Sequence, residues 1–117
     1  MANGISKKNV RFPKKSVNHY IKKLNDVIQL NGVLLFGSFA YGNPNKHSDI
    51  DLVIISPDFK KIKFGERMQW LHEQRDEISD AIPMDLVGYT PEEFRSVAKN
   101  SAIMAKAKKE GCWLYKK

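Results

Sequence analysis

The chain has 117 residues, of which 42% are hydrophobic, and its 20 Lys and Arg against 13 Asp and Glu give a formal net charge of +7. This length fits one domain with its own hydrophobic core, and the apolar content excludes a wholly disordered chain. The sequence has no apolar run of the ~18–20 residues that span a bilayer and no signal-peptide pattern. Its one cysteine, Cys112, cannot form an intrachain disulfide or a cysteine-rich zinc site. We therefore expect a cytoplasmic globular protein.

The positive charge gathers at the two ends of the sequence. Residues 1–23 carry seven basic side chains and no acidic one, and residues 95–117 carry seven basic side chains and one acidic one. This distribution favours contact with a polyanion, either RNA or the phosphates of a nucleotide. The alternative is that the lysines only keep exposed surfaces soluble. We expect residues 1–15 to form a loose, basic N-terminal arm and residues 16–117 to form a single domain.

The first half of this domain predicts one helix and two strands. Apolar residues recur at helical spacing from Ser16 to Asn31, with Ser16 as a candidate N-cap and Gly32 as a candidate stop. The unbroken apolar run at 33–36 is typical of a short buried strand, and it ends at a Gly-Ser pair. After a loop rich in Gly, Asn and Pro, the apolar run at 50–55 predicts a second strand.

The second half predicts two helical regions and two further strands. Residues 65–80 have apolar side chains at helical spacing, and residues 84–89 form a short apolar run that predicts a third strand. The Thr-Pro-Glu-Glu sequence from Thr90 combines an N-cap, a proline at the first helical position and a capping-box Glu, and we expect the following helix to break near Asn100. Residues 112–115 predict an edge strand. The expected fold class is α/β (α+β), a small mixed sheet of three to four strands with helices packed against it.

The stretch between the first two strands holds two features that favour the same ligand. Gly37 allows a tight turn where backbone N–H groups can approach a phosphate, and the hydroxyl of Ser38 can add a donor. Asp49 and Asp51 flank a single residue at the start of the second strand, so both side chains project from one face. Two such carboxylates repel each other unless a divalent cation such as Mg²⁺ binds them.

A third carboxylate, that of Asp85, lies in the otherwise apolar third strand, where an unpaired charge is costly. If the second and third strands are neighbours, Asp85 joins Asp49 and Asp51 on one face of the sheet. Three carboxylates around a triphosphate are the ingredients of two-metal phosphoryl transfer. Taken alone, each feature has an ordinary alternative: a common turn, a solvated strand start, and an aspartate paired with a lysine.

The combination resembles the nucleotidyltransferase superfamily of the DNA polymerase β type, whose signature is Gly-Ser, ten residues and Asp-x-Asp. This chain has that signature from Gly37 to Asp51, with Ser48 directly before the first Asp. The sequence at 110–115 is similar to the Glu-Gly-x-x-Leu-Tyr tail of the minimal members of the family. The resemblance covers residues 16–115.

This resemblance implies a polymerase β-like fold and the transfer of a nucleoside monophosphate to a hydroxyl acceptor, in the simplest case AMP from ATP, otherwise from another nucleoside triphosphate. It implies that Asp49, Asp51 and Asp85 are catalytic and hold two Mg²⁺ ions, with Asp85 as the base toward the acceptor hydroxyl. The candidate nucleotide-binding residues are Gly37, Ser38, Lys46 and Ser48.

One loop position departs from the family. Minimal members carry Arg in the loop after Gly-Ser, where this chain has Tyr41. Tyr41 supplies only a hydroxyl and a ring, so a cation near the phosphates is lost, and Lys46 of the same loop is the candidate to replace it. Because the carboxylates are unchanged, the departure concerns the turnover rate and the choice of donor rather than the metal site.

The acceptor is left open by the sequence. Because the site and its scaffold use nearly the whole chain, we expect another chain or a homo-oligomer to bring the acceptor. Minimal members often occur with a small helical HEPN partner, a ribonuclease toxin that they neutralise, in some cases by adenylylating it, so the resemblance implies an antitoxin role. The alternatives are transfer to a small molecule such as an aminoglycoside or to an RNA end, and a catalytically weak module that binds nucleotide, or RNA through its basic ends.

Overall fold

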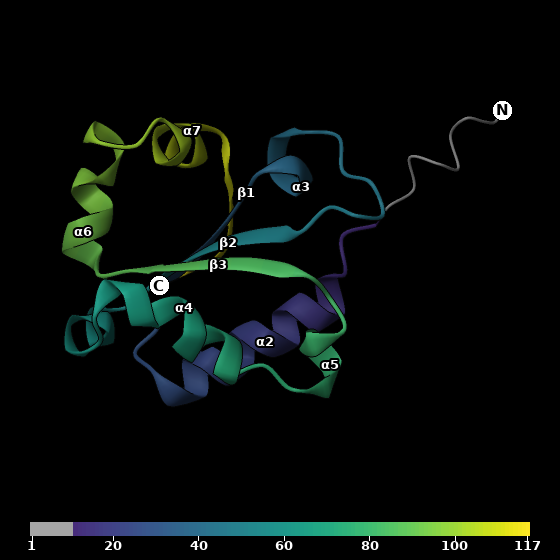
Figure 1. Ribbon diagram of the computed structural model, residues 1–117, viewed down its shortest axis with the longest axis horizontal. Coiled ribbons are helices and arrows are strands. Elements are labelled where there is room, and N and C mark those ends of the chain that lie inside the picture. Colours follow the sequence, from purple (N-terminus) through teal and green to yellow (C-terminus); the bar gives the residue numbers. More distant parts are fainter. Residues whose placement is uncertain (1–10) are drawn as a thin grey trace, which may run out of the picture.

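A four-stranded mixed sheet is the centre of the computed structural model, which describes residues 11–117 (Figure 1). The strands are β1 (Gly32–Phe36), β2 (Ile50–Ile55), β3 (Met84–Tyr89) and β4 (Cys112–Lys116). Their order is β3-β2-β1-β4, in which β2 and β3 are parallel and β1 is antiparallel to both β2 and β4. The predicted fold class is confirmed, and every strand lies where an apolar run predicts it.

Helices cover both faces of this sheet (Figure 1). One face carries α2 (Lys14–Val27), α4 (Phe64–Glu73) and α5 (Glu77–Asp80), and the other carries α3 (Ser38–Tyr41), α6 (Pro91–Ser96) and α7 (Ala102–Glu110). Two short 3-10 helices, η1 (Pro57–Lys61) and η2 (Val97–Lys99), complete the connections. Among residues 11–117, none of the helices has the length and apolar character needed to cross a membrane.

Two cores of buried side chains lie on the two faces of the sheet. The smaller core lies between the sheet and α7, and its buried members are Leu34, Phe36, Val53, Ile55, Met104 and Ala107. The larger core lies between the sheet and the helices α2 and α4, and its fully buried side chains include Tyr20, Leu24, Phe59 and Leu71. Because strand side chains alternate between faces, Val53 and Ile55 of β2 face the smaller core, whereas Ile50 and Ile54 face the larger one.

Helix α2 begins and ends earlier than the sequence predicts. It starts at Lys14 with Pro13 in the N-cap position and without a side-chain cap, so the prediction of Ser16 as the N-cap is wrong. The backbone becomes extended at Ile28, with φ −135° and ψ 163°. Gly32 is therefore not the helix stop but the first residue of β1.

The predicted N-terminal arm falls mostly on residues 1–10, which lie outside the described part of the chain, so it stays a prediction there. The following residues are attached to the domain. The ring of Phe12 packs edge-on against that of Phe39 with 6.1 Å between the ring centroids, and α2 begins at Lys14.

The single helix predicted over 65–80 is two helices, α4 and α5. The helix is interrupted because the carboxylate of Asp76 accepts hydrogen bonds from two backbone N–H groups of the next turn, forming a capping box that starts α5. Of the apolar side chains on which the prediction depends, Leu71 is buried, whereas Met68 and Ile78 are 51% and 52% exposed. The apolar spacing therefore does not reveal where α4 ends, because a polar side chain produces the interruption before α5.

The prediction for the segment after β3 is confirmed. The hydroxyl of Thr90 accepts a hydrogen bond from the backbone N–H of Glu93, and the Glu93 carboxylate accepts one from the backbone N–H of Thr90, at 3.1 and 2.8 Å. This capping box begins α6. The expected break near Asn100 separates η2 from α7, which the hydroxyl of Ser101 caps.

A buried arginine connects α4 with the sheet and with α6. The side chain of Arg67 is buried, and its guanidinium donates hydrogen bonds to the carbonyl oxygens of Ile62 (2.9 Å) and Gly88 (3.2 Å). It also forms an ion pair with Glu93, with 2.6 Å between nitrogen and oxygen. The hydrogen bond from Arg67 lowers the pKa of Glu93, so this carboxylate stays ionised at neutral pH.

The substitution Arg67→Ala should lower the free energy of unfolding by about 2–4 kcal/mol, because it leaves buried carbonyl groups without a donor and removes the packing of the side chain. Urea denaturation measures this change. Arg95→Ala is the matched control, because Arg95 is 70% exposed and pairs only with Glu92 on its own helix; this change should cost less than about 0.5 kcal/mol. Similar losses in both variants would contradict the structural role of Arg67.

A second polar contact connects α2 with α5. The Asp76 carboxylate lies 2.7 Å from Nε2 of His19 and 3.5 Å from Nζ of Lys23. Chiefly through its hydrogen bond with His19, the folded protein lowers the pKa of Asp76 to about 2. Ionised Asp76 therefore contributes stability that is complete above the ordinary carboxyl pKa of ~4 and is lost as the pH falls from there toward 2.

Thermal denaturation between pH 5 and about pH 2 tests this linkage. The melting temperature of the unmodified protein should fall more steeply with acidification than that of Asp76→Asn, which lacks the titrating group. Asp26→Asn is the control, because Asp26 is an exposed carboxylate of α2 and should leave the slope unchanged. If Asp76→Asn kept the full slope, the linkage would be wrong.

Candidate active site

The turn after β1 has a backbone conformation that favours glycine. Gly37 has φ 74° and ψ −157°, in the left-handed half of conformational space that other residues rarely adopt. A Cβ atom at Gly37 would overlap Oδ2 of Asp51 and lie 2.9 Å from its Cγ. The backbone of the turn therefore lies directly against the Asp51 carboxylate, as only a residue without a side chain allows.

The register of β2 and β3 places two of the predicted carboxylates side by side. The strands are parallel neighbours, and Asp51 pairs with Asp85. Two residues further along, Val53 and Val87 both contact the smaller core. Because side chains two residues apart share a face, the Asp51 and Asp85 side chains lie on the face of the sheet that α7 covers, at the end that the core does not reach.

Asp49 lies directly before β2, two residues from Asp51. Partial burial, followed by the charges of Asp85 and Asp49, raises the pKa of Asp51 to about 6. The side chains of Asp49 and Asp85 are exposed and that of Asp51 is half-buried. Asp85 is therefore not the buried charge that its apolar strand suggests, because the sheet is open at this end.

This donor set fits a hard divalent cation. Carboxylate oxygens are the ligands that Mg²⁺ prefers, and a cation removes the repulsion that raises the pKa of Asp51. Within residues 11–117, the side chains of His, Cys, Asp and Glu form no group of three or more that could hold a metal ion. Mg²⁺ sites usually combine one or two carboxylates with water and substrate phosphates, so these residues fit a site that the substrate completes.

The loop before β2 uses one of its candidate residues for its own structure. The hydroxyl of Ser48 accepts a hydrogen bond from the backbone N–H of Asn45 (2.9 Å), and the Ser48 N–H donates to the Asn45 carbonyl oxygen (3.0 Å). Lys46 is exposed in this turn. Nucleotide contacts by Lys46 and Ser48 stay predictions, and the structure gives Ser48 a role in holding the loop ahead of Asp49.

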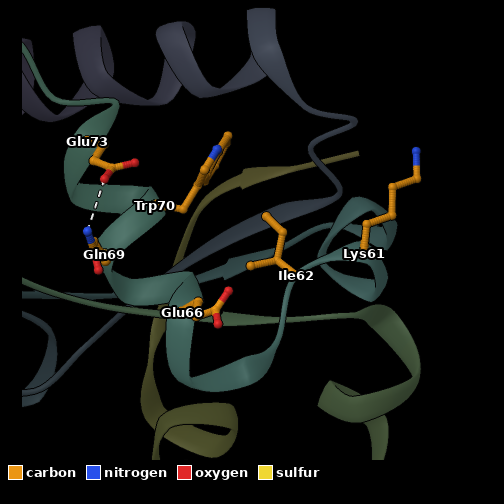
Figure 2. Close-up of a pocket in the computed structure, with 6 residues that line it drawn as sticks. All are labelled: Lys61, Ile62, Glu66, Gln69, Trp70 and Glu73. Carbon is orange, nitrogen blue, oxygen red and sulfur yellow. Dashed lines mark hydrogen bonds between the residues drawn. The ribbon is translucent and has the colours of Figure 1, made fainter.

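A cavity of about 490 Å³ lies away from these residues, along α4 on the opposite side of the sheet (Figure 2). Its lining residues are Lys61, Ile62, Glu66, Gln69, Trp70 and Glu73. None of the predicted site residues borders it. The ring of Trp70 packs edge-on against that of the buried Phe59, with 6.2 Å between the ring centroids, so the indole is partly a core side chain.

One basic side chain beside α3 was not predicted from the sequence. Nζ of Lys106 in α7 lies 4.9 Å from the centre of the Tyr41 ring in α3. The two residues are far apart in the chain, and no motif or spacing connects them. The chain has many lysines, and it is the packing of α7 over the sheet that places Lys106 beside Tyr41.

The chain is similar to known proteins in its family and its fold. Residues 15–109 match the family described as nucleotidyltransferase domain. No curated protein matches the chain.

Three solved structures share the fold. A candidate nucleotidyltransferase from Sulfolobus solfataricus has a TM-score of 0.64 at 18% identity, over 89% of this chain and 80% of that one. A toxin–antitoxin structure with AMP-PNP has a TM-score of 0.56 at 25% identity, over 91% and 75% of the two chains. A mutant of the toxin–antitoxin MntA-HpeT has a TM-score of 0.53 at 23% identity, over 86% and 73%.

The close approach of Gly37 to Asp51 yields a stability prediction. Gly37→Ala should lower the free energy of unfolding by about 1–3 kcal/mol, because the new Cβ requires a strained backbone and displaces the Asp51 carboxylate. Gly65→Ala in α4 is the matched control: nothing lies within 4 Å of its Cβ position, and Ala favours helix, so stability should be unchanged or rise by up to about 1 kcal/mol. Chemical denaturation compares the two, and an equally stable Gly37→Ala would disprove the close packing.

Proposed function

Because this chain belongs to the nucleotidyltransferase domain family, we propose that it transfers the nucleoside monophosphate of a nucleoside triphosphate, in the simplest case ATP, to a hydroxyl acceptor. The observation that carries this proposal is the pairing of Asp51 with Asp85 in the sheet, with the Gly37 turn packed against Asp51. This arrangement brings two acidic side chains and the Gly37 turn together at one end of the sheet, which supports their proposed parts as metal ligands and phosphate-binding turn.

Each residue of the site has a proposed part in the reaction. Asp49, Asp51 and Asp85 hold divalent cations, two Mg²⁺ ions in this proposal, which when bound neutralise charge on the triphosphate and lower the pKa of the acceptor hydroxyl. The Gly37 backbone allows the triphosphate to approach closely, and the Ser38 hydroxyl donates to a phosphate oxygen. The Ser38 N–H, in the first turn of α3, has no acceptor within that helix and is a further donor.

The bond changes follow from this placement. The acceptor oxygen bonds to the α-phosphorus, the bond between that phosphorus and the bridging oxygen toward the β-phosphate breaks, and pyrophosphate leaves with the bonding electrons. The exposed carboxylate of Asp85 accepts the proton of the acceptor hydroxyl. Its exposure supports this role, because an acceptor from outside the chain can reach it.

We propose that the acceptor is a hydroxyl on a protein partner, a small helical protein of the HEPN type, which the chain modifies as its antitoxin. Two observations support this choice. Asp49 and Asp85 are exposed at an open sheet end rather than enclosed in a cavity, which suits a side chain presented by another protein. Similar solved structures are of toxin–antitoxin proteins, one of them with AMP-PNP.

RNA ends are the second candidate acceptor. Residues 95–117 carry seven basic side chains and one acidic one, and they include α7, which lies on the same face of the sheet as the carboxylates. Such a surface attracts a polyanion. This observation favours RNA over an aminoglycoside, which is itself a cation.

The carboxylates can be tested by substitution. Asp51→Asn and Asp85→Asn should each reduce Mg²⁺-dependent transfer of α-phosphate label from ATP by at least about 100-fold, because each removes charge from the metal site. Asp26→Asn, an exposed carboxylate of α2, is the control and should retain full transfer. Asp51→Asn should fold at least as stably as the unmodified protein, since it removes both the partial burial of a charge and the repulsion from Asp85 and Asp49, which together raise the Asp51 pKa. Undiminished transfer by a stably folded Asp51→Asn would refute the proposed function.

The acceptor is identified by mass spectrometry. The protein is incubated with ATP and Mg²⁺ together with the product of the neighbouring reading frame, an RNA oligonucleotide or an aminoglycoside, each in a separate reaction. We expect the partner protein to gain the mass of AMP, and Asp51→Asn to abolish the gain. Labelling of the RNA end or the aminoglycoside instead would contradict the antitoxin role and leave nucleotidyl transfer in place.

A further inference from the structure

Lys106 carries a positive charge next to the helix that follows the Gly-Ser turn. Its Nζ lies 4.9 Å from the centroid of the Tyr41 ring, within the distance at which an ammonium group is attracted to an aromatic face. Tyr41 is the last residue of α3, the single helical turn that begins at Ser38. The ammonium group therefore lies beside the side chain that ends the helix beginning at the Gly37–Ser38 turn.

The position of Lys106 is set by the packing of its helix. Its neighbour Ala107 is fully buried in the smaller core, and Met104 is 6% exposed. At the end of α7, a Cβ atom on Gly111 would lie only 2.8 Å from the carbonyl oxygen of Leu35. The helix thus touches β1 two residues before Gly37, and it has little freedom to move away from the turn.

Lys106 and the carboxylates are on the same side of the sheet. The Tyr41 ring packs against the smaller core, and so does Val53, which shares a face of β2 with Asp51. Figure 1 shows α3 and α7 above the same face of the sheet. Lys106, Tyr41 and Asp51 therefore lie on the same side of the sheet.

A polyphosphate ligand needs a positively charged group in this region, because the carboxylates there are negatively charged as well. The negative charge of this region includes the carboxylates of Asp51 and Asp85, which pair in the parallel strands β2 and β3, and a triphosphate adds further negative charge. The neighbouring Lys108 is already engaged, because its Nζ donates hydrogen bonds to the carbonyl oxygens of Phe94 (2.8 Å) and Arg95 (3.2 Å). Lys106 is exposed, and its side chain contacts the Tyr41 ring.

We propose that Lys106 binds the polyphosphate of the donor nucleotide, and that the ring of Tyr41 is a positioning residue that holds the ammonium group toward the Gly37–Ser38 turn. This inference rests on the proposed function, since it adds a phosphate ligand to the same site. In this proposal, Lys106 near the end of the domain and the glycine-serine turn near its start bind the same polyphosphate. Lys106 recognises the charge of the polyphosphate and makes no contact with the base or the sugar.

Nucleotide binding measured by isothermal titration calorimetry tests this proposal. Lys106→Met should weaken binding of ATP with Mg²⁺ by about tenfold or more, the effect of losing one charge-assisted hydrogen bond, and should leave the affinity for adenosine unchanged. Lys109→Met is the matched control, because Lys109 is an exposed lysine of the same helix, and it should weaken ATP binding by less than about twofold. Lys106 is also exposed, so both variants should melt at the temperature of the unmodified protein.

Variants of Tyr41 test the positioning role. Tyr41→Leu removes the aromatic face and should weaken ATP binding by about two- to fivefold, whereas Tyr41→Phe keeps the ring and should bind ATP more tightly than Tyr41→Leu. In the Lys106→Met background, Tyr41→Arg should restore most of the lost affinity, because it returns a cation to the same place. A purely structural role of Tyr41 predicts no such rescue.

The outcomes separate this inference from the proposed function. If the unmodified protein binds ATP and transfers label while Lys106→Met binds ATP equally well, the role of Lys106 is wrong and the proposed function stands. Equal losses of ATP affinity in Lys106→Met and Lys109→Met would show that the effect comes from general surface charge, and this result would overturn the inference. If Lys106→Met loses ATP affinity selectively but Asp51→Asn still transfers label, the phosphate site is supported and the proposed catalytic role fails. If the unmodified protein binds no ATP, both are wrong.

Discussion

The parallel pairing of β2 with β3 holds like charges together, and the rest of the site depends on it. Asp51 and Asp85 occupy the same register position, and their repulsion, added to partial burial, raises the pKa of Asp51. A free chain would separate these carboxylates. Here the backbone hydrogen bonds of the sheet and the two cores beyond the site keep them in place, and the packing of Gly37 against Asp51 leaves that side chain little space to turn away.

The arrangement of helices determines what can reach these carboxylates. The larger core, beneath α2 and α4, closes one face of the sheet, and α7 covers only part of the other. At the end of the sheet near Gly37, the side chain of Asp49 is exposed. Asp85 is exposed there, which is consistent with a reaction on a hydroxyl supplied from outside, and the cavity along α4 is on the far side of the sheet.

The strands could be predicted from local sequence, because short apolar runs identify buried strands. The Asp-x-Asp spacing predicts two side chains on one face, and the roles of these carboxylates stay predictions. The helix boundaries could not be predicted in this way. The break before α5 depends on a capping box at Asp76 and on its hydrogen bond with His19, a residue far away in the chain. The same limit applies to Lys106, whose proximity to Tyr41 arises from tertiary packing alone. Apolar periodicity predicts which side chains of a segment are buried, but it does not predict which distant side chains will contact that segment.

The sheet order has a consequence during synthesis. Among the strands of residues 11–117, β4 is the last in chain order, and it pairs with β1, the first. Until β4 emerges, the outer edge of β1 has unpaired backbone groups on a strand whose side chains are otherwise buried, which is a surface prone to association with other chains. The nascent protein thus contains Asp51 and Asp85 before its sheet is complete. Strand β4 (Cys112–Lys116) then protects the edge of β1, the strand that leads into the Gly37 turn.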